Sequence, residues 1–205
     1  MTTNTTSTQT VTVPSLGPVD VTVTDHGEGQ LFLLLHAGAG PQSVSGFAEL
    51  FADTHGVRVI VPTHPGFGGT PRPEALDSVQ DLAALYGALV DQLDLTDVTV
   101  IGNSVGGWIT AEIALQKSPR VSGIVLIDAV GLDVPGHPVA DFFALSDESE
   151  ASSKLASDES EAGWEHTVSW IDCTSGSDLR GLFRRARPVA GRTGKPWRER
   201  SRRVP

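Results

Sequence analysis

The chain has 205 residues, a hydrophobic fraction of 39% and a mean hydropathy of −0.05, values that suit one globular domain with a sizeable core. Its single cysteine, Cys173, excludes an internal disulfide, and no cysteine or histidine cluster has metal-ligand spacing, so neither a metal nor an organic cofactor is expected. Residues 1–179 carry 24 acidic and five basic side chains, which would repel phosphates and argue against nucleic acid as a partner.

The first segment, residues 1–10, is rich in threonine and lacks the basic and apolar regions of a secretory signal, so we expect a flexible N-terminus and a cytoplasmic protein. No apolar run in the chain approaches the roughly 18 residues of a membrane span, so no membrane partner is expected. Two alternating apolar and polar runs follow, Thr10–Val13 and Val19–Val23. They are separated by Gly17-Pro18 and predict an antiparallel hairpin.

From Leu31 onward, strand patterns and helix patterns alternate along the chain. Short apolar runs at 31–35, 57–61, 98–101 and 124–127 predict buried strands. Helical spacing marks two helices between them, the first by Val44, Phe47, Leu50 and Phe51 and the second by apolar residues from Val79 to Leu93, with Ser78 and Asp81 placed as a capping pair. This alternation predicts an α/β fold, with a mostly parallel sheet and helices on both faces, over residues 11–133.

Glycine-rich loops follow two of these strands. The first is His36-Ala37-Gly38-Ala39-Gly40, and the second spans residues 63–69. Glycines let the backbone come close to a ligand, and the carboxyl ends of parallel strands meet at one edge of a sheet. We therefore expect these loops to converge on one crevice.

The most informative segment is Gly102-Asn103-Ser104-Val105-Gly106-Gly107, because an apolar strand pattern runs into it and a helical pattern runs out of it. A serine on such a turn is a candidate nucleophile, since its hydroxyl is held clear of the backbone. The helix N-terminus beside it would favour an oxyanion. A plain glycine-rich turn is the alternative interpretation.

Four segments together resemble the α/β-hydrolase fold superfamily, and their order and spacing match it over about residues 10–145; they are residues 36–40, 64–68, 102–106 and 126–131. The resemblance implies that Ser104 is the nucleophile and that the backbone N–H groups of Val105 and Gly38 form the oxyanion hole, with Ala39 as the alternative to Gly38. It also implies that His36 is a structural loop residue, and that His64 shapes the crevice or binds substrate.

The resemblance implies the order serine, acid, histidine for the remaining catalytic groups. Asp128, after the strand at 124–127, is the best acid candidate, although a polar strand end is the simpler interpretation of it. His137 and His166 follow Ser104, but neither comes after a recognisable terminal strand, so no base is identified. We expect a serine hydrolase acting on a small ester- or carbonyl-type substrate; the alternative is an impaired hydrolase that binds ligands or has no activity.

The last third of the chain departs from the alternating pattern. Residues 134–179 contain the motif 146–151 repeated at 157–162 and predict an acidic lid-like cap, with a solvated helix or a partly disordered segment as the simpler interpretation. Residues 180–205 hold ten basic side chains and form an irregular basic tail. Taken as protein, this composition is typical of a disordered basic arm; the alternative hypothesis is a frameshift or truncation, which would leave the C-terminal part incomplete. The oligomeric state is left open.

Overall fold

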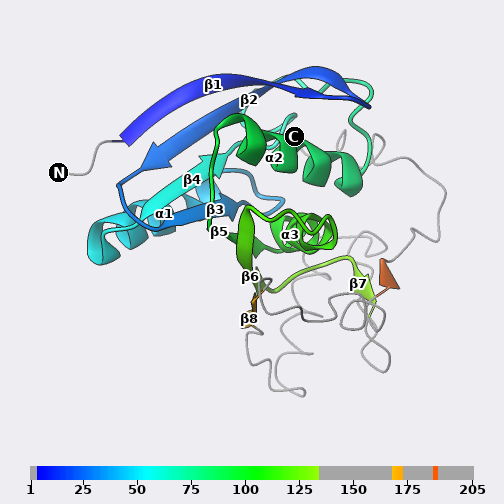
Figure 1. The fold of residues 1–205 in the computed structure, drawn as a ribbon. Helices are drawn as coiled ribbons and strands as arrows, with labels where there is room; N and C mark the ends of the chain where they lie inside the picture. Colours follow the sequence, from blue (N-terminus) through cyan, green and yellow to red (C-terminus); the bar gives the residue numbers. More distant parts are fainter. Residues whose placement is uncertain (1–3, 134–167, 173–186, 189–205) are drawn as a thin grey trace, which may run out of the picture.

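A computed structural model describes residues 4–133, 168–172 and 187–188 (Figure 1). Its main sheet has seven strands in the spatial order β1-β2-β4-β3-β5-β6-β8. In that order the strands are β1 (Asn4–Val13), β2 (Gly17–His26), β4 (Arg58–Pro62), β3 (Leu31–Leu35), β5 (Val98–Asn103), β6 (Val121–Ile127) and β8 (Val168–Asp172). A separate two-stranded sheet pairs β7 (Leu132–Asp133) with β9 (Arg187–Pro188).

The N-terminal hairpin is confirmed, and it is longer than the sequence indicated. Strands β1 and β2 pair antiparallel without interruption from Asn4 opposite His26 to Val13 opposite Gly17. The expected flexible segment 1–10 is therefore wrong for residues 4–10, which belong to β1. The physical reason is that β-branched threonines favour extended backbone, and each of these residues has a partner on β2.

The centre of the sheet is parallel, as predicted. Strand β3 pairs parallel with β4 on one side and β5 on the other, and β5 pairs parallel with β6. Antiparallel strands complete both sides, with β2 on β4 and β8 on β6. Strand β8 falls inside the segment 134–179 that was expected to form a lid; apart from β8, that segment lies outside the described residues, as does the basic tail except for Arg187–Pro188.

Helices cover both faces of the sheet, again as predicted. Helix α1 (Gln42–His55) packs on one face, and α2 (Val79–Gln92) and α3 (Val105–Leu115) pack on the other (Figure 1). The strands alternate accordingly: Leu34 joins the α1 cluster, while Leu33 and Leu35 join the α2–α3 cluster. Successive side chains of β3 therefore point alternately to the two helix layers.

Helix α1 differs in detail from its predicted face. Small residues mediate its packing, because Val44, Ala48 and Ala52 are the buried ones. Phe47 and Leu50, which marked the helix in the sequence, are 48% and 65% exposed. The apolar stripe is therefore wider than the surface that α1 buries.

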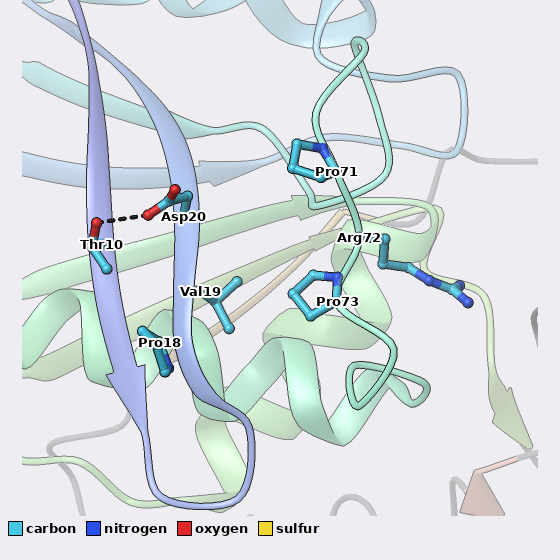
Figure 2. A pocket seen from close by; sticks show the side chains of 7 residues that line it. All are labelled: Thr10, Pro18, Val19, Asp20, Pro71, Arg72 and Pro73. Atoms are coloured by element: carbon cyan, nitrogen blue, oxygen red, sulfur yellow. Dashed lines mark hydrogen bonds between the residues drawn. The ribbon is translucent and has the colours of Figure 1, made fainter.

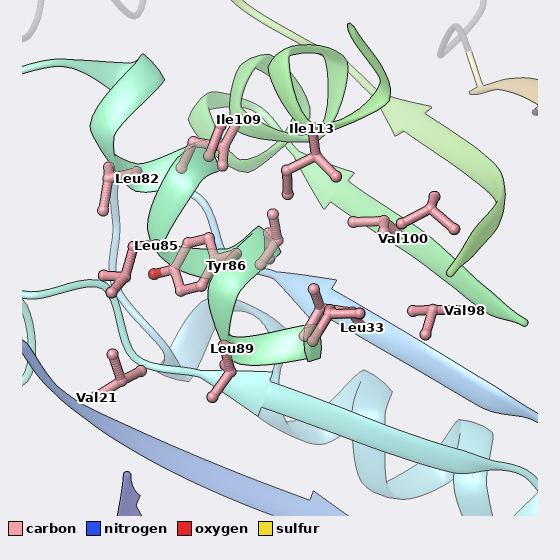
Figure 3. Close-up of a cluster of buried hydrophobic side chains, with 14 of the residues drawn as sticks. Val21, Leu33, Leu82, Leu85, Tyr86, Leu89, Val98, Val100, Ile109 and Ile113 are labelled. Atoms are coloured by element: carbon pink, nitrogen blue, oxygen red, sulfur yellow. The ribbon is translucent and has the colours of Figure 1, made fainter. Parts of the chain in front are cut away.

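Helix α2 carries the larger core. Its N-terminus has the predicted capping box, in which the Ser78 hydroxyl accepts from the Asp81 N–H and the Asp81 carboxylate accepts from the Ser78 N–H, both at 3.1 Å. The ring of Tyr86 lies among apolar side chains of α2, α3 and β3 (Figure 3). A buried tyrosine needs a partner for its hydroxyl, and that partner is described below.

Candidate active site

Ser104 lies alone between the end of β5 and the start of α3. Its backbone has φ 54° and ψ −114°, in the positive-φ region that residues with a side chain rarely adopt. Strained conformations of this kind concentrate at functional sites, where the surrounding packing holds them. The side chain is half-buried and makes no capping hydrogen bond to α3, so the helix does not hold the hydroxyl.

Two glycines make this turn sterically feasible. A Cβ atom on Gly102 would lie 2.2 Å from the Gly106 carbonyl oxygen, and a Cβ atom on Gly106 would lie 2.3 Å from the Leu35 carbonyl oxygen. Neither position can hold a larger residue without moving backbone. The first contact confirms that the two arms of the turn approach each other, and the second shows that α3 begins against the end of β3.

The end of β6 and the segment after it also contact the turn. The Ser104 N–H donates to the Ile127 carbonyl at 2.9 Å, and the Val130 N–H donates to the Ser104 carbonyl at 3.3 Å. Ile127 and Val130 flank Asp128, so the backbone of Ser104 is hydrogen-bonded to residues on both sides of Asp128. Asp128 itself is exposed and has a φ of 44°. The structure places the predicted acid candidate in the segment that holds the candidate nucleophile in place.

The loop after β3 reaches the same place. Gly106 packs against the carbonyls of Leu35 and His36, so the start of α3 lies beside this loop. Gly38 and Ala39 are exposed in it. Val105 is the first residue of α3, and its N–H has no partner within the helix. The structure thus brings the predicted oxyanion donors to one end of the sheet; their role in catalysis remains a prediction.

Two buried histidines join the loop after β3 to the loop after β4. The rings of His36 and His64 stack with centroids 3.6 Å apart. The His64 N–H donates to Nε2 of His36 at 3.0 Å, and Nε2 of His64 lies 3.0 Å from the His36 carbonyl oxygen. Nδ1 of His36 lies 2.7 Å from the Ala37 carbonyl oxygen, and Nδ1 of His64 bonds the Tyr86 hydroxyl.

These partners determine where the protons are. A carbonyl oxygen only accepts, so Nδ1 of His36 and Nε2 of His64 carry their hydrogens and donate. Nε2 of His36 must then accept from the His64 N–H, and Nδ1 of His64 must accept from the Tyr86 hydroxyl. Every polar atom of this group has a partner only when both imidazoles are neutral.

Burial favours the same protonation states. It lowers the pKa of His36, and burial together with the charge of a protonated His36 lowers the pKa of His64 to about 3. Burial raises the pKa of Tyr86 well above its usual value. All three groups are therefore neutral near pH 7, and neither histidine offers an exposed basic nitrogen to Ser104.

Sequence reasoning missed the part played by Tyr86. It is the chain's only tyrosine and lies on the apolar stripe of α2, so the periodicity explained it as a core residue. A signal was available, because a core tyrosine requires a hydrogen-bond partner and His64 was a polar residue whose own partner had not been identified. The burial of His64 fits the predicted role of shaping the crevice.

The other histidines and the surface hollows are separate from this site. Nδ1 of His26 bonds the Asn4 side chain at 2.9 Å within the hairpin, and the ring of His55 packs against Phe51 on α1. His137 and His166 lie outside the described residues.

A hollow of about 460 Å³ lies between the hairpin and the loop at Pro71 to Pro73, where Figure 2 shows the Arg72 side chain directed away from the hairpin. None of the predicted site residues lines it.

Within the described ranges, no group of three histidine, cysteine or acidic residues is arranged to hold a metal ion. The same part of the chain contains no helix that is long and apolar enough to cross a membrane. What the arrangement offers chemically is a strained serine, exposed loop amides and a helix N-terminus at the carboxyl edge of a parallel sheet.

Comparison with known proteins gives three kinds of match. A family described as the alpha/beta hydrolase fold matches residues 30–172. The 2-hydroxy-6-oxo-2,4-heptadienoate hydrolase of Pseudomonas putida strain F1 is 31% identical over 119 residues, which are 57% of this chain and 43% of that protein. The 2-hydroxymuconate semialdehyde hydrolase of Pseudomonas putida is 35% identical over 115 residues, 54% of this chain and 40% of that protein. The match thus spans less than half the length of these relatives.

Solved structures agree in fold. An esterase from Exiguobacterium antarcticum superposes with a TM-score of 0.57 at 21% identity, covering 76% of this chain and 57% of the esterase. A bromoperoxidase from Bacillus anthracis superposes with a TM-score of 0.55 at 23% identity, covering 77% of this chain and 56% of the other. At these identities the likeness establishes the fold alone.

Proposed function

Since this chain belongs to the α/β-hydrolase fold family, we propose that it is a serine-dependent hydrolase of a small carbonyl compound, with Ser104 as its nucleophile. The observation that carries the proposal is the backbone of Ser104, held at φ 54° between β5 and α3 with a hydroxyl that caps nothing. A strained, half-buried serine beside a helix N-terminus suits nucleophilic attack. A small-molecule substrate and a cytoplasmic location belong to the same proposal.

The proposed reaction begins when Oγ of Ser104 attacks the carbonyl carbon and gives its proton to a base. The carbonyl oxygen becomes an oxyanion, which accepts hydrogen bonds from the N–H groups of Val105 and Gly38. Collapse of this intermediate expels the leaving group, which takes up the proton, and leaves an acyl-serine. Water then attacks the acyl carbon and gives one proton to the base; the bond to Oγ breaks, the carboxylic acid product leaves, and that proton returns to Ser104. Asp128 is the proposed acid, and the base is not identified.

The relatives suggest a substrate class. Those at 31% and 35% identity are named as hydrolases of an oxo-dienoate and of a muconate semialdehyde, whereas structural neighbours include an esterase. We propose that the substrate is an oxo acid of the oxo-dienoate or muconate semialdehyde class, with an ester as the competing class. Either presents the carbonyl carbon that Ser104 would attack.

Labelling with a fluorophosphonate probe tests the nucleophile. We expect the folded chain to be labelled at Ser104, the Ser104→Ala variant to be unlabelled, and Ser45→Ala, which removes an exposed serine of α1, to label like the parent protein. Turnover of 2-hydroxy-6-oxo-dienoates and of p-nitrophenyl esters then separates the two substrate classes. Equal labelling of the Ser104→Ala variant would end the nucleophile assignment.

One observation favours a second candidate function, a ligand-binding protein with impaired catalysis. Both histidines at the crevice end, His36 and His64, are committed to internal hydrogen bonds, and the described part of the chain has no histidine after Ser104. Without a base, a triad enzyme keeps only a residual acceleration of roughly 10³–10⁴-fold over water. Thermal stabilisation by oxo acids without labelling or turnover would identify this alternative.

A further inference from the structure

Strand β1 forms one edge of the main sheet, and among the described residues no strand pairs with its outer side. Strand β1 begins the strand order, and within the described residues β2 is its only neighbour. Figure 1 shows it running along the margin of the molecule. The strand is ten residues long, and nearly all of its first seven residues are exposed. A strand edge of this length offers many backbone groups to another strand.

The pairing on the other side of the hairpin shows which backbone groups point outward. The Thr22 carbonyl accepts from the Thr63 N–H at 2.8 Å, so the backbone groups of Thr22 face away from β1. Thr22 lies opposite Thr8, which makes this a pair without mutual hydrogen bonds. The N–H and C=O groups of Thr8 therefore face the open edge, as do those of every second residue: Asn4, Thr6, Thr10 and Thr12.

Nothing in the sequence of β1 protects this edge. Natural edge strands are usually guarded by charges, prolines or bulges. Strand β1 has neither a charged residue nor a proline between Asn4 and Val13, and its register with β2 has no irregularity. The contrast with the rest of residues 1–179, which carry 24 acidic side chains, makes this neutral strand the place where two copies would repel each other least.

We propose that the β1 edge pairs antiparallel with the β1 edge of a second copy, about a twofold axis that passes through Thr8. A twofold axis normal to the sheet turns β1 of one copy into an antiparallel neighbour and keeps each face of the sheet on the same side. Side chains of two paired residues must point to the same face, so their residue numbers must differ by an even number. The axis therefore passes beside a residue that pairs with its own copy, and not between two residues.

The outward groups select the register. An axis at Thr8 pairs Thr6 with Thr10, Asn4 with Thr12 and Thr8 with itself, so all five outward residues exchange hydrogen bonds. An axis at Gln9 would place Asn4 opposite Pro14, and because proline has no N–H, the Asn4 carbonyl would lack a donor. The Thr8 register also stacks threonines opposite threonines on the exposed face, a favourable cross-strand pair.

The charges nearest the proposed interface already have partners. Asp20, opposite Thr10, accepts from the Thr10 hydroxyl at 2.6 Å, and Asp25, opposite Thr5, pairs with Arg58 at 2.6 Å. Neither carboxylate projects from β1 itself. Since the two bodies are acidic, added salt should tighten the dimer by screening their mutual repulsion.

A cysteine at the axis tests both partner and register. In the full chain with Cys173→Ser, Thr8→Cys would place two thiols opposite each other with Cα atoms about 5.5 Å apart, within the range for a disulfide. We expect rapid oxidation to a covalent dimer. Thr22→Cys is the matched control, because its two copies would lie about 14 Å apart across the same axis. Equal cross-linking of the two variants, or none by Thr8→Cys, would overturn the proposal.

Analytical ultracentrifugation of the full chain gives a second test without cysteines. We expect a concentration-dependent dimer whose dissociation constant rises about tenfold or more in Thr8→Pro, which loses an edge N–H on each copy, and stays within about threefold in Thr8→Ala. The proline removes an outward donor, so folding should survive, and far-UV circular dichroism would check this. A monomer at all concentrations, as expected if another segment of the same chain covered the edge, contradicts the proposal.

Discussion

The crevice end of the sheet and the N-terminal hairpin differ in which contacts hold them: side-chain and close backbone contacts at the crevice, and backbone pairing in the hairpin. At the crevice, Gly102 and Gly106 leave no room for a Cβ atom beside backbone carbonyls, and two imidazoles are buried with a tyrosine hydroxyl. In the hairpin the backbone is paired along ten residues, but most side chains of β1 face solvent. The comparison teaches that the region where chemistry is proposed depends on exact side-chain and backbone contacts, whereas the hairpin depends mainly on backbone pairing.

The largest contrast should come from a single methyl group. Gly106→Ala places a Cβ atom 2.3 Å from the Leu35 carbonyl, and we expect a loss of about 3 kcal/mol in the free energy of unfolding. The hairpin control is Gly17→Ala, where nothing lies within 4 Å and only the φ of 72° is unfavourable, for a loss of about 1 kcal/mol. Urea denaturation of both variants measures the difference, and equal losses would remove the contrast.

Deleting a hydroxyl should also separate the two regions. Tyr86→Phe leaves Nδ1 of His64 buried without a donor, and we expect a loss of about 2 kcal/mol. Thr6→Val removes the exposed hydroxyl contact to Thr24, at 3.3 Å, and should change stability by less than about 0.5 kcal/mol. Chemical denaturation with both variants in one buffer provides the measurement; a neutral Tyr86→Phe would contradict the assigned tautomers.

Acid should weaken the crevice end through His64. Its pKa is about 3 when folded, against about 6.5 when unfolded, so below pH 6.5 the unfolded chain binds a proton that the folded chain does not. Stability is therefore complete above pH 6.5 and falls by roughly 1 kcal/mol per pH unit as the pH drops toward 3. Denaturation between pH 7 and 4 should show a shallower slope in His64→Gln, because the carboxylates are common to both proteins. Identical slopes would refute this contribution.

Relief of strain should give the smallest effect and the opposite sign. Ser104→Gly allows the φ of 54° without a Cβ penalty, and we expect a gain of about 1 kcal/mol after the entropy of glycine is counted. Ser104→Ala keeps the Cβ atom and serves as the control, with stability close to that of the parent. Thermal unfolding of the three proteins measures the gain, and a destabilised Ser104→Gly would show that this backbone stores no strain.

Much of the fold could be predicted because its signals are local. The period of apolar residues gave the strands of the parallel centre and the helices, and the paired Ser78 and Asp81 gave the start of α2. The Gly-x-Ser-x-Gly turn was predictable for the same reason, since strand, serine and helix are contiguous. The exposure of Phe47 and Leu50 was not predictable, because periodicity marks an apolar stripe and does not tell how much of it the neighbouring layer covers.

By itself, the sequence determined the alternation of strands and helices over residues 31–127 and the turn that carries the candidate nucleophile. The tertiary structure alone decided that His36, His64 and Tyr86 share one hydrogen-bonded group, and that Asn4–Thr10 extends the hairpin. The physical reason is separation along the chain: periodicity reports neighbours within a few residues, whereas those three side chains meet only because β3, β4 and α2 pack together.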